Sequence, residues 1–404
     1  MRRRVAVTGI GLVTPLGDDP DTFLRRLLAG ESGVGPITLF DPATLPTRIA
    51  AEARVATALR DRKVTFALTA ARRALEAASA CGSRPRGAGA VSLGLGLELF
   101  SMDDMARARA PGFALPEGQL ERLTFLQTPT DLVVPLISRE LGLTAPPRTH
   151  VSACAAGADA LGAAFRLVAT GRRDWMLAGG SDSMIHPLGV GGFCKLTALS
   201  TRNDAPTRAS RPFDRARDGF VLGEGAGVVV LEPLDEAVAR GATVLGEVVG
   251  YGSSFDAHGI SEPHPEARGA LQAMTRALDD AGLRPEAIDC VNAHGTGTPK
   301  NDPVEALALR RLLGDRLGQV PVCATKSMIG HLIAAAGAVE AIAALLCLRA
   351  GVVHGNPSLE EPDPACADLD LPRAAREHPQ RHVLSTSYGF GGQNAALVLR
   401  RHDA

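Results

Sequence analysis

The sequence predicts an α/β protein built from two similar halves that follow one another without a linker. Runs typical of strands alternate with runs typical of helices along the chain, and this order predicts parallel sheets covered by helices on both faces. The order starts again near residue 243. We therefore expect an N-terminal half over residues 1–242 and a C-terminal half over residues 243–404, related by a pseudo-two-fold axis.

Composition narrows the class of protein. Of 404 residues, 45% are hydrophobic, which suits a globular chain with a sizeable core. Aromatic residues make up only 4%, whereas glycine occurs 44 times, so the core is expected to pack through small residues. A net charge of −1 gives no electrostatic reason to expect nucleic acid or an anionic membrane as a partner.

The cysteines and the N-terminus indicate a cytoplasmic protein. Seven cysteines are scattered without a CxxC pair, so we expect neither a disulfide framework nor a metal site, and a reducing compartment fits. The first residues lead into a short strand instead of the long apolar run of a signal peptide. No apolar run reaches ~18 residues without a charge, so no transmembrane helix is predicted.

In the N-terminal half the first strand is expected over residues 5–8, followed by the glycines Gly9 and Gly11. A strand followed by the pattern Gly-x-Gly suggests a dinucleotide-binding site. Pro15 and the absence of the third glycine of the dinucleotide-binding fingerprint argue against such a site, so we interpret the glycines as tight-turn residues. The other elements expected here are helices over 21–28, 64–79, 130–141, 158–170 and 234–240, and strands over 90–97, 149–152, 175–180 and 228–232. Residues 98–121 are less regular and are interpreted as an excursion over a pocket or a subunit interface.

The C-terminal half repeats the alternation after a long polar run over 199–223. That run is too rich in Pro, Asp and Arg for a core and too patterned for a linker. The elements expected are strands over 245–250, 290–293, 320–324, 383–387 and 396–399, and helices over 267–281, 304–313 and 337–349.

Cys154 lies at the predicted turn between a strand and the N-terminus of a helix. Free backbone N–H groups and the helix dipole favour an anion there, which predicts a stabilised thiolate, the nucleophilic form of cysteine. Its small neighbours, Ala153 and Ala155 to Gly157, let a substrate carbonyl approach the backbone. The alternative is that Cys154 is one more small buried apolar residue.

Two histidines follow strands in the second half. His294 lies in Asn-Ala-His-Gly-Thr-Gly-Thr-Pro, and His331 ends Thr-Lys-Ser-Met-Ile-Gly-His before an apolar helix. Either alone is more often structural. A duplicated fold would bring Cys154 and His294 together, and a Cys–His–His set of this kind supports nucleophilic catalysis.

These motifs, with Ser152–Gly157 and Gly389-Phe-Gly-Gly-Gln-Asn394, resemble those of the β-ketoacyl-acyl-carrier-protein synthases. The nearest resemblance is to the elongating enzymes of type II fatty acid and polyketide synthesis. It runs from Val5 to Leu399, and Ser210–Asp214 with Arg217–Gly225 belongs to it as well. The resemblance implies a thiolase-like five-layer αβαβα fold, a dimer and acyltransferase activity.

The resemblance also implies roles for residues. Cys154 would accept an acyl group from an acyl carrier protein, with the N–H groups of Cys154 and Phe390 as oxyanion hole. His294 and His331 would bind the malonyl thioester carbonyl and stabilise the enolate formed as CO2 leaves, and the product would be 3-oxoacyl-ACP. No resident cofactor is implied, because the phosphopantetheine arrives on the carrier.

Supporting residues are implied around this set. Lys326 would hold Glu305 in a buried pair. Asp302 and Glu305 match the acidic positions after the first histidine, and they are equally well explained as carboxylates at a helix N-terminus. Phe390 would gate acyl entry. The implied substrate-binding residues are Thr296, Thr298, Leu97 and Phe193, and arginines near the tunnel mouth would dock the acidic carrier.

Three positions and several alternatives stay open. Glu98 and Phe100 lie where the family usually has more glycine, and Tyr388 lies where it usually has Phe, so chain length and pathway are undecided, with a slight preference for a specialised route. The main alternative is the ketosynthase subunit of a type II polyketide or polyene synthase, working as a heterodimer with a chain-length-factor-like partner. The intact Cys–His–His set argues against a chain-length factor itself or a scaffold. The two histidines and the missing C-terminal Cys-x-Gly argue against a thiolase that uses acyl-CoA.

Overall fold

The computed structural model describes residues 2–57, 59–97, 99–100 and 127–403. Glu98 and most of the predicted excursion over 98–121 lie outside these residues, and the side chain of Phe100 is likewise not described.

Ten strands form one hydrogen-bonded sheet that divides into two parts of five. In spatial order the first part is β7 (Arg148–His150), β4 (Gly89–Leu95), β8 (Trp175–Asp182), β9 (Gly225–Pro233) and β1 (Val5–Val13). The second part continues with β10 (Gly246–Phe255), β16 (Gln393–Arg400), β15 (His382–Gly389), β11 (Cys290–Asn292) and β12 (Val322–Cys323).

The two parts have the same topology. In each part, three parallel strands are followed by two strands that pair antiparallel. In the first part β7, β4 and β8 are the parallel strands, and β9 and β1 follow them. In the second part β12, β11 and β15 are the parallel strands, and β16 and β10 follow them. The two parts meet where β1 pairs antiparallel with β10. The predicted duplication is therefore confirmed strand by strand. The chain passes from one part to the other between α8 (Leu234–Ala239) and β10.

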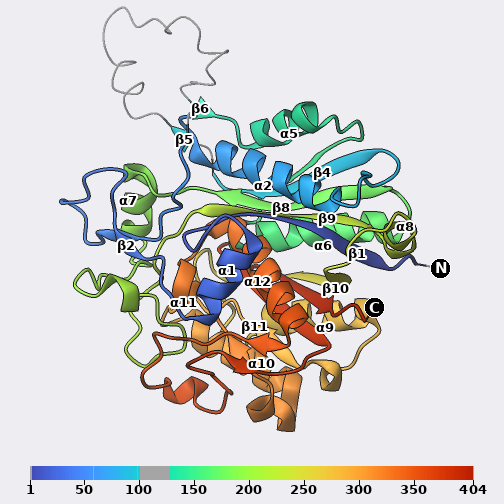
Figure 1. Ribbon diagram of the computed structural model, residues 1–404. Coiled ribbons are helices and arrows are strands. Elements are labelled where there is room, and N and C mark those ends of the chain that lie inside the picture. Colours follow the sequence, from blue (N-terminus) through green and yellow to red (C-terminus); the bar gives the residue numbers. More distant parts are fainter. Residues whose placement is uncertain (1, 58, 98, 101–126, 404) are drawn as a thin grey trace, which may run out of the picture.

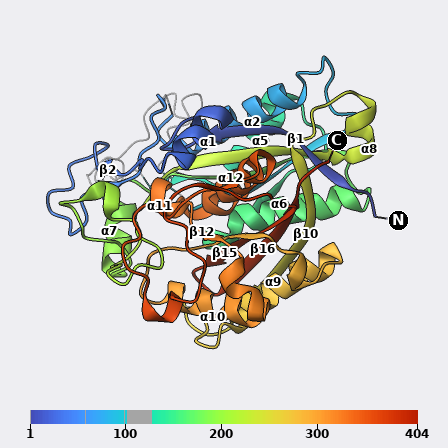
Figure 2. The same ribbon diagram turned by 60° about the horizontal axis from the view of Figure 1, so that its bottom comes forward.

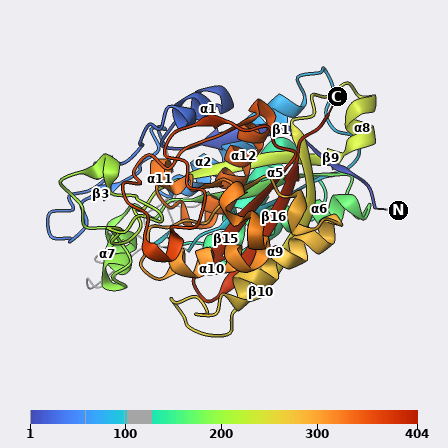
Figure 3. The same cartoon turned by 90° about the horizontal axis from the view of Figure 1, so that it is seen from below.

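Helices complete five layers (Figure 1). The outer layer on the first part is α2 (Arg62–Ala78) and α5 (Val133–Leu141), and on the second part α9 (Arg268–Ala281) and α10 (Asn301–Leu313). Figure 3 shows α9 and α10 in front of β15 and β16. The middle layer is α6 (Ala156–Ala169) and α12 (Ala336–Ala350), which contact each other and the strands of both parts. Figure 2 shows both chain ends on one side of the molecule.

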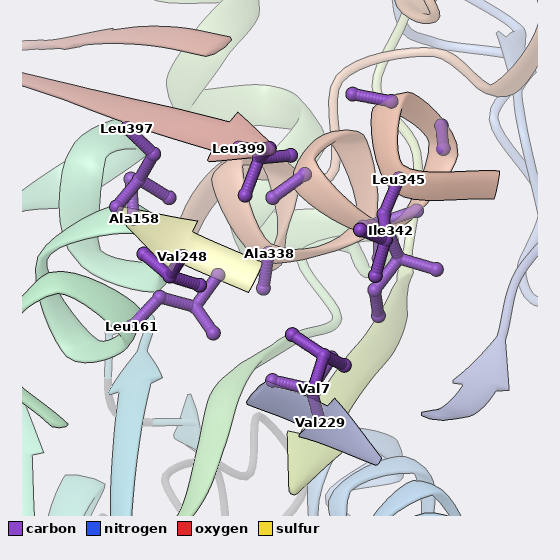
Figure 4. Close-up of a cluster of buried hydrophobic side chains, with 14 of the residues drawn as sticks. Val7, Ala158, Leu161, Val229, Val248, Ala338, Ile342, Leu345, Leu397 and Leu399 are labelled. Carbon is purple, nitrogen blue, oxygen red and sulfur yellow. The ribbon is translucent and has the colours of Figure 1, made fainter. Parts of the chain in front are cut away.

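The largest apolar cluster lies in the middle layer and takes side chains from both parts (Figure 4). The two central helices touch at equivalent glycines. A Cβ on Gly157 would lie 2.9 Å from the Ala338 nitrogen, and one on Gly337 would lie 2.9 Å from the Ala158 nitrogen. The segment Ile333–Ala350 is apolar and long enough to cross a membrane by length and composition, yet 89% of it is buried inside the protein, as expected of a core helix.

The first strand differs from its prediction. β1 runs to Val13, so Gly9 and Gly11 lie within the strand, and their interpretation as turn residues is wrong. A Cβ at Gly9 would lie 2.1 Å from the Ala74 carbonyl oxygen, and one at Gly11 would lie 1.9 Å from that of Ala70. The glycines are needed because α2 packs directly on the strand.

Most other elements differ from their expected bounds by a few residues. Among elements not yet described, the sequence predicted α1 (Pro20–Leu28) and missed α7 (Pro187–Lys195) and α11 (Lys326–Ile329). The short strands are β2 (Gly35–Pro36), β3 (Ile49–Ala50), β5 (Leu99–Phe100), β6 (Gln127–Thr128), β13 (Val352–Val353) and β14 (Arg376–Glu377).

Candidate active site

A pocket of about 300 Å³ opens where the strand ends of both parts meet. Cys154 enters it from the first part, and His294 and His331 enter it from the second. The structure therefore brings together the three residues that sequence analysis singled out, from positions up to 177 residues apart in the chain. The other lining residues used below are Phe220, Thr296, Thr298, Lys300, Tyr388 and Phe390.

Cys154 lies in a single 3₁₀ turn, Ala153–Ala155, between β7 and α6. Ala153 has a φ of 49°, a left-handed conformation that is rare for a residue with a side chain. Gly389 lies against the turn: a Cβ there would be 2.8 Å from the Ser152 carbonyl oxygen and 3.2 Å from the Cys154 nitrogen. The backbone N–H of Phe390 faces the Cys154 thiol and lowers its pKa. Two backbone amides, those of Cys154 and Phe390, are thus grouped around the sulfur.

The predicted stabilisation of the Cys154 thiolate is wrong. Cys154 is only 4% exposed, and burial raises the pKa of its thiol to about 11. The Lys326 ammonium and the Phe390 N–H lower this pKa, but desolvation outweighs them. At neutral pH the sulfur is therefore a thiol, and its proton has to leave as the sulfur reacts. The sequence showed the helix end but not the depth at which the turn is buried.

His331 is held in one tautomer by the backbone. Its Nδ1 accepts the N–H of Ile333 at 3.0 Å, so in the neutral ring the proton is on Nε2. Ile333 also has a left-handed φ, 47°. Burial and the charge of Lys326 hold the pKa of His331 well below its usual value, so the ring is neutral.

His294 is held in the same tautomer by a lysine. Lys326 Nζ lies 3.1 Å from His294 Nδ1, and an ammonium group has hydrogens to donate but no lone pair, so Nδ1 is the acceptor and Nε2 carries the proton. Burial, Lys326 and His331 keep the pKa of His294 well below its usual value. The two ring centroids are 5.3 Å apart. The pocket thus holds two neutral imidazoles, each with Nε2–H as its remaining donor.

Lys326 has a different acid partner from the one expected. Its Nζ lies 2.6 Å from Glu340 on α12, both side chains being 1% exposed, and it also donates to the His294 carbonyl oxygen at 2.6 Å. The predicted Lys326–Glu305 pair is wrong. Burial raises the pKa of Glu340 to about 7, against the lowering effect of Lys326. Sequence analysis missed Glu340, although a single acidic residue inside an apolar helix signals a buried partner.

Glu305 and Asp302 hold the backbone of the loop that carries His294. Glu305 accepts the N–H groups of His294 and Gly295, each at 2.8 Å, and the Thr386 hydroxyl at 2.9 Å. Asp302 accepts the N–H groups of Phe213 at 2.7 Å and Gly297 at 3.2 Å. Both carboxyls are fully buried, and burial raises both pKa values. Their role in the structure is thus to anchor a loop; neither contacts an imidazole ring by a side-chain hydrogen bond among the described residues.

The predicted substrate-binding residues fall into two groups. Thr296 and Thr298 line the pocket, and their hydroxyls lie 2.9 Å apart. Phe193 packs against Phe220 and Phe390, with ring centroids at 5.5 and 6.4 Å, so it adjoins the pocket through them.

Leu97 lies apart from this group. Its side chain is 65% exposed and outside the pocket lining, while its carbonyl oxygen accepts Lys63 Nζ at 2.7 Å. No arginine is in the described lining, but Arg217 adjoins it by donating to the Thr298 carbonyl oxygen at 2.9 Å, so carrier docking on arginines near the mouth stays a prediction. The lysine in the lining is Lys300, which pairs with Glu262. In the described part of the chain, no group of three or more His, Cys, Asp or Glu side chains is arranged to hold a metal ion.

Comparison with known proteins agrees with this geometry. Residues 2–237 match the family profile "Beta-ketoacyl synthase, N-terminal domain", and residues 245–360 match "Beta-ketoacyl synthase, C-terminal domain". The 3-oxoacyl-(acyl-carrier-protein) synthase 2 of Coxiella burnetii (strain RSA 493 / Nine Mile phase I) is 41% identical over 411 residues, which cover 99% of each chain.

Two solved structures are similar over the full length. A type II PKS ketosynthase, in complex with its acyl-carrier protein and bound to the hexaketide, has a TM-score of 0.88 at 29% identity, covering 100% of each chain. The ishigamide ketosynthase/chain length factor has a TM-score of 0.87 at 33% identity, with the same coverage. The chain therefore belongs to the β-ketoacyl synthase family of acyltransferases and has the thiolase-type fold that its sequence predicts.

Proposed function

We propose that the protein is an elongating β-ketoacyl-ACP synthase, which condenses an acyl group held on Cys154 with malonyl-ACP. The observation that carries this proposal is the pairing, in one pocket, of a buried thiol beside two backbone amides with two neutral imidazoles that each offer Nε2–H. The first set suits acyl transfer, and the second suits an enolate. Membership of the family, with a relative named as a 3-oxoacyl-ACP synthase, supports the assignment.

In the first half-reaction, Cys154 Sγ attacks the thioester carbonyl of acyl-ACP. The S–C bond to Cys154 forms, the bond to the pantetheine sulfur breaks, and the thiol proton ends on the departing pantetheine sulfur. The N–H groups of Cys154 and Phe390 stabilise the tetrahedral oxyanion, and the Lys326 charge favours the sulfur as it becomes anionic. Preorganised donors in a buried site need no reorganisation as charge develops.

In the second half-reaction, malonyl-ACP enters the same pocket with its thioester carbonyl toward His294 and His331. The bond to the carboxylate breaks, CO2 leaves, and its electrons form an enolate that accepts hydrogen bonds from both Nε2–H groups. The enolate carbon attacks the acyl-Cys154 carbonyl, and the bond to Sγ breaks. 3-Oxoacyl-ACP leaves, and the Cys154 thiolate takes up one proton from solvent. Thr296, Thr298 and Phe390 are proposed to contact the pantetheine arm and to gate the pocket.

The proposed partners are acyl-loaded and malonyl-loaded carrier proteins and a second subunit. At one margin of the sheet β12 is covered by its own chain, since Val322 donates to the Asp370 carbonyl oxygen at 2.8 Å. At the other margin β7 pairs with β4 alone among the described strands, and Val151 beside it is 58% exposed. We propose that β7 faces a second copy of the chain. The alternative is a chain-length-factor-like partner, favoured by the similarity to the ishigamide complex.

The proposed chemistry calls for no resident cofactor or metal, because the phosphopantetheine is part of the substrate. We propose that it takes place in the cytoplasm.

The test is intact mass spectrometry after mixing the protein with carrier proteins loaded with acyl groups of different lengths. We expect a mass gain of one acyl group in the wild type and none in Cys154→Ala. The acyl group that loads best identifies the pathway. If none loads, the experiment is repeated after co-expression with a chain-length-factor-like subunit, and absence of loading there too would contradict the proposal.

A further inference from the structure

We propose that Asp182 is a positioning residue for His331, and that Gly389, its counterpart in the second half, keeps the amide of Cys154 open. Asp182 ends β8 and Gly389 ends β15, strands of equal length at equivalent places in the two parts of the sheet. Each is paired with the first residue of the strand that follows, Gly225 and Gln393 respectively. The inference rests on the proposed function, because it concerns the same site.

The turns that these two residues face are also equivalent. Ala155-Ala156-Gly157-Ala158 opens α6, and Ala335-Ala336-Gly337-Ala338 opens α12, so Cys154 corresponds to Ala334 and Ala153 to Ile333. The backbone repeats as well: φ is 49° at Ala153 and 47° at Ile333, and a 3₁₀ turn follows in each case.

The occupants of the two turns differ. In the second half, Asp182 Oδ2 accepts the N–H of Ala334 at 3.0 Å, while Oδ1 accepts the N–H of Ser183 at 2.8 Å. In the first half the corresponding position is Gly389, which has no side chain to accept the Cys154 N–H. The Asp182 carboxylate therefore accepts the backbone N–H of Ala334 in one turn, whereas the N–H of Cys154 in the other turn remains free to bind a developing oxyanion.

The Asp182 contact reaches His331 through two residues of backbone. By binding the Ala334 amide, it holds in place the residue that directly follows Ile333, whose left-handed conformation is rare for a residue with a side chain. That conformation directs the Ile333 N–H onto His331 Nδ1, which places the proton on Nε2. Asp182 is fully buried and does not line the pocket, so it does not touch substrate. Besides binding the turn, its charge raises the pKa of the Cys154 thiol.

The test is the substitution Asp182→Asn, which hardly changes the volume of the side chain. It leaves one acceptor oxygen for the two N–H groups, of Ala334 and Ser183, that the carboxylate binds. Lys63 keeps its partner Asp61 at 2.8 Å, so no buried ammonium is left unpaired. We expect condensation to fall roughly tenfold through misplacement of His331. Loading of Cys154 should not fall, because loss of the Asp182 charge removes one influence that raises the pKa of the thiol. The matched control is Glu232→Gln, a buried carboxylate that pairs with Arg240 at the end of β9 opposite to Gly225, the strand partner of Asp182, and this change should not separate the two half-reactions.

A second measurement reports the tautomer of the His331 ring directly. In protein labelled with ¹⁵N-histidine, with His331 assigned by His331→Gln, we expect a single Nε2–H tautomer in the wild type and a mixture in Asp182→Asn. An unchanged tautomer with both half-reactions unchanged, or with both reduced equally, would overturn the inference. If Asp182→Asn does not fold, Asp182→Ser provides the same comparison. Failure of wild-type loading, both alone and after co-expression with a chain-length-factor-like subunit, would instead refute the proposed function itself.

Discussion

The two halves of this protein share one topology and differ where the chemistry requires it. The first half places Cys154 in a turn whose amide is left open by Gly389, and the second half places Ala334 in the same turn with its amide bound by Asp182. The second half instead supplies two histidines and the ion pair that fixes one of them. A duplicated scaffold has thus divided the reaction: one half is proposed to bind the acyl group, and the other the enolate.

The buried charges follow the same division. The turn of Cys154 is surrounded by small residues, and burial raises the pKa of its thiol. Around His294 and His331, Lys326 and Glu340 form a pair that is almost completely buried. A buried pair of this kind adds little net stability, and loss of one partner is costly, so we interpret it as a device that sets the tautomer of His294.

The largest effect expected from this division is a separation of the two half-reactions by histidine substitution. His294→Ala or His331→Ala each removes one donor to the enolate, and condensation should fall by about 10²–10³-fold. Loading of Cys154 should remain, because neither ring supplies the oxyanion hole. Product formation measures condensation, and intact mass measures loading of Cys154. Equal loss of both would show that the halves do not divide the reaction.

The next effect tests the open amide. Gly389→Ala introduces a Cβ 2.8 Å from the Ser152 carbonyl oxygen and 3.2 Å from the Cys154 nitrogen, so the turn must shift. We expect loading to slow by about 10²-fold, the cost of a displacement near 1 Å. Gly192→Ala, at a helical glycine with open space around it, is the control. Rapid loading in Gly389→Ala would mean that this amide is not used.

A smaller effect concerns the protonation of Cys154. Because its pKa is about 11, the thiolate fraction at pH 7–10 should rise about tenfold for each pH unit, and so should the rate of alkylation by iodoacetamide. Peptide mass spectrometry in a Cys81→Ser background follows Cys154 without interference from that exposed thiol. A rate that levels off near neutral pH would reveal a stabilised thiolate and contradict the assignment.

The smallest effect compares two equivalent side chains one residue before the strand ends. In the first half the Ser181 hydroxyl donates to the Lys63 carbonyl oxygen at 2.8 Å, whereas the Tyr388 hydroxyl in the second half is buried without a described partner. Ser181→Ala should lower the free energy of unfolding by about 1 kcal/mol, and Tyr388→Phe should leave it unchanged or raise it slightly. Denaturant unfolding measures both. A clear loss in Tyr388→Phe would show that the hydroxyl has a partner.

The sequence predicted the fold well where local pattern decides it. Strand and helix order, the duplication and the turn of Cys154 all follow from apolar periodicity and glycine stops. Gly9 and Gly11 were misread, because only the packing of α2 on β1 shows that these glycines are needed inside a strand. Strand register and the pairing of β1 with β10 are long-range features that no local pattern contains.

The sequence predicted which residues form the site, but it did not predict the ion-pair partner of Lys326 or the direction of the pKa shift of Cys154. Cys154, His294 and His331 meet as expected, whereas the partner of Lys326 is Glu340 and not Glu305. The choice depends on which acid faces the ammonium across the central layer, and this requires coordinates. Burial of Cys154 likewise depends on the whole fold, so the direction of its pKa shift could not be read from its helix end.

The most direct test of the account moves the thiol to the equivalent turn. In the double variant Cys154→Ala/Ala334→Cys, the sulfur lies at the start of α12, where Asp182 occupies the amide. Intact mass after incubation with acyl carrier protein should show no acyl group beyond the background of Cys154→Ala alone. An acyl group on the thiol introduced in place of Ala334 would mean that the open amide opposite Gly389 does not determine which half binds the acyl chain.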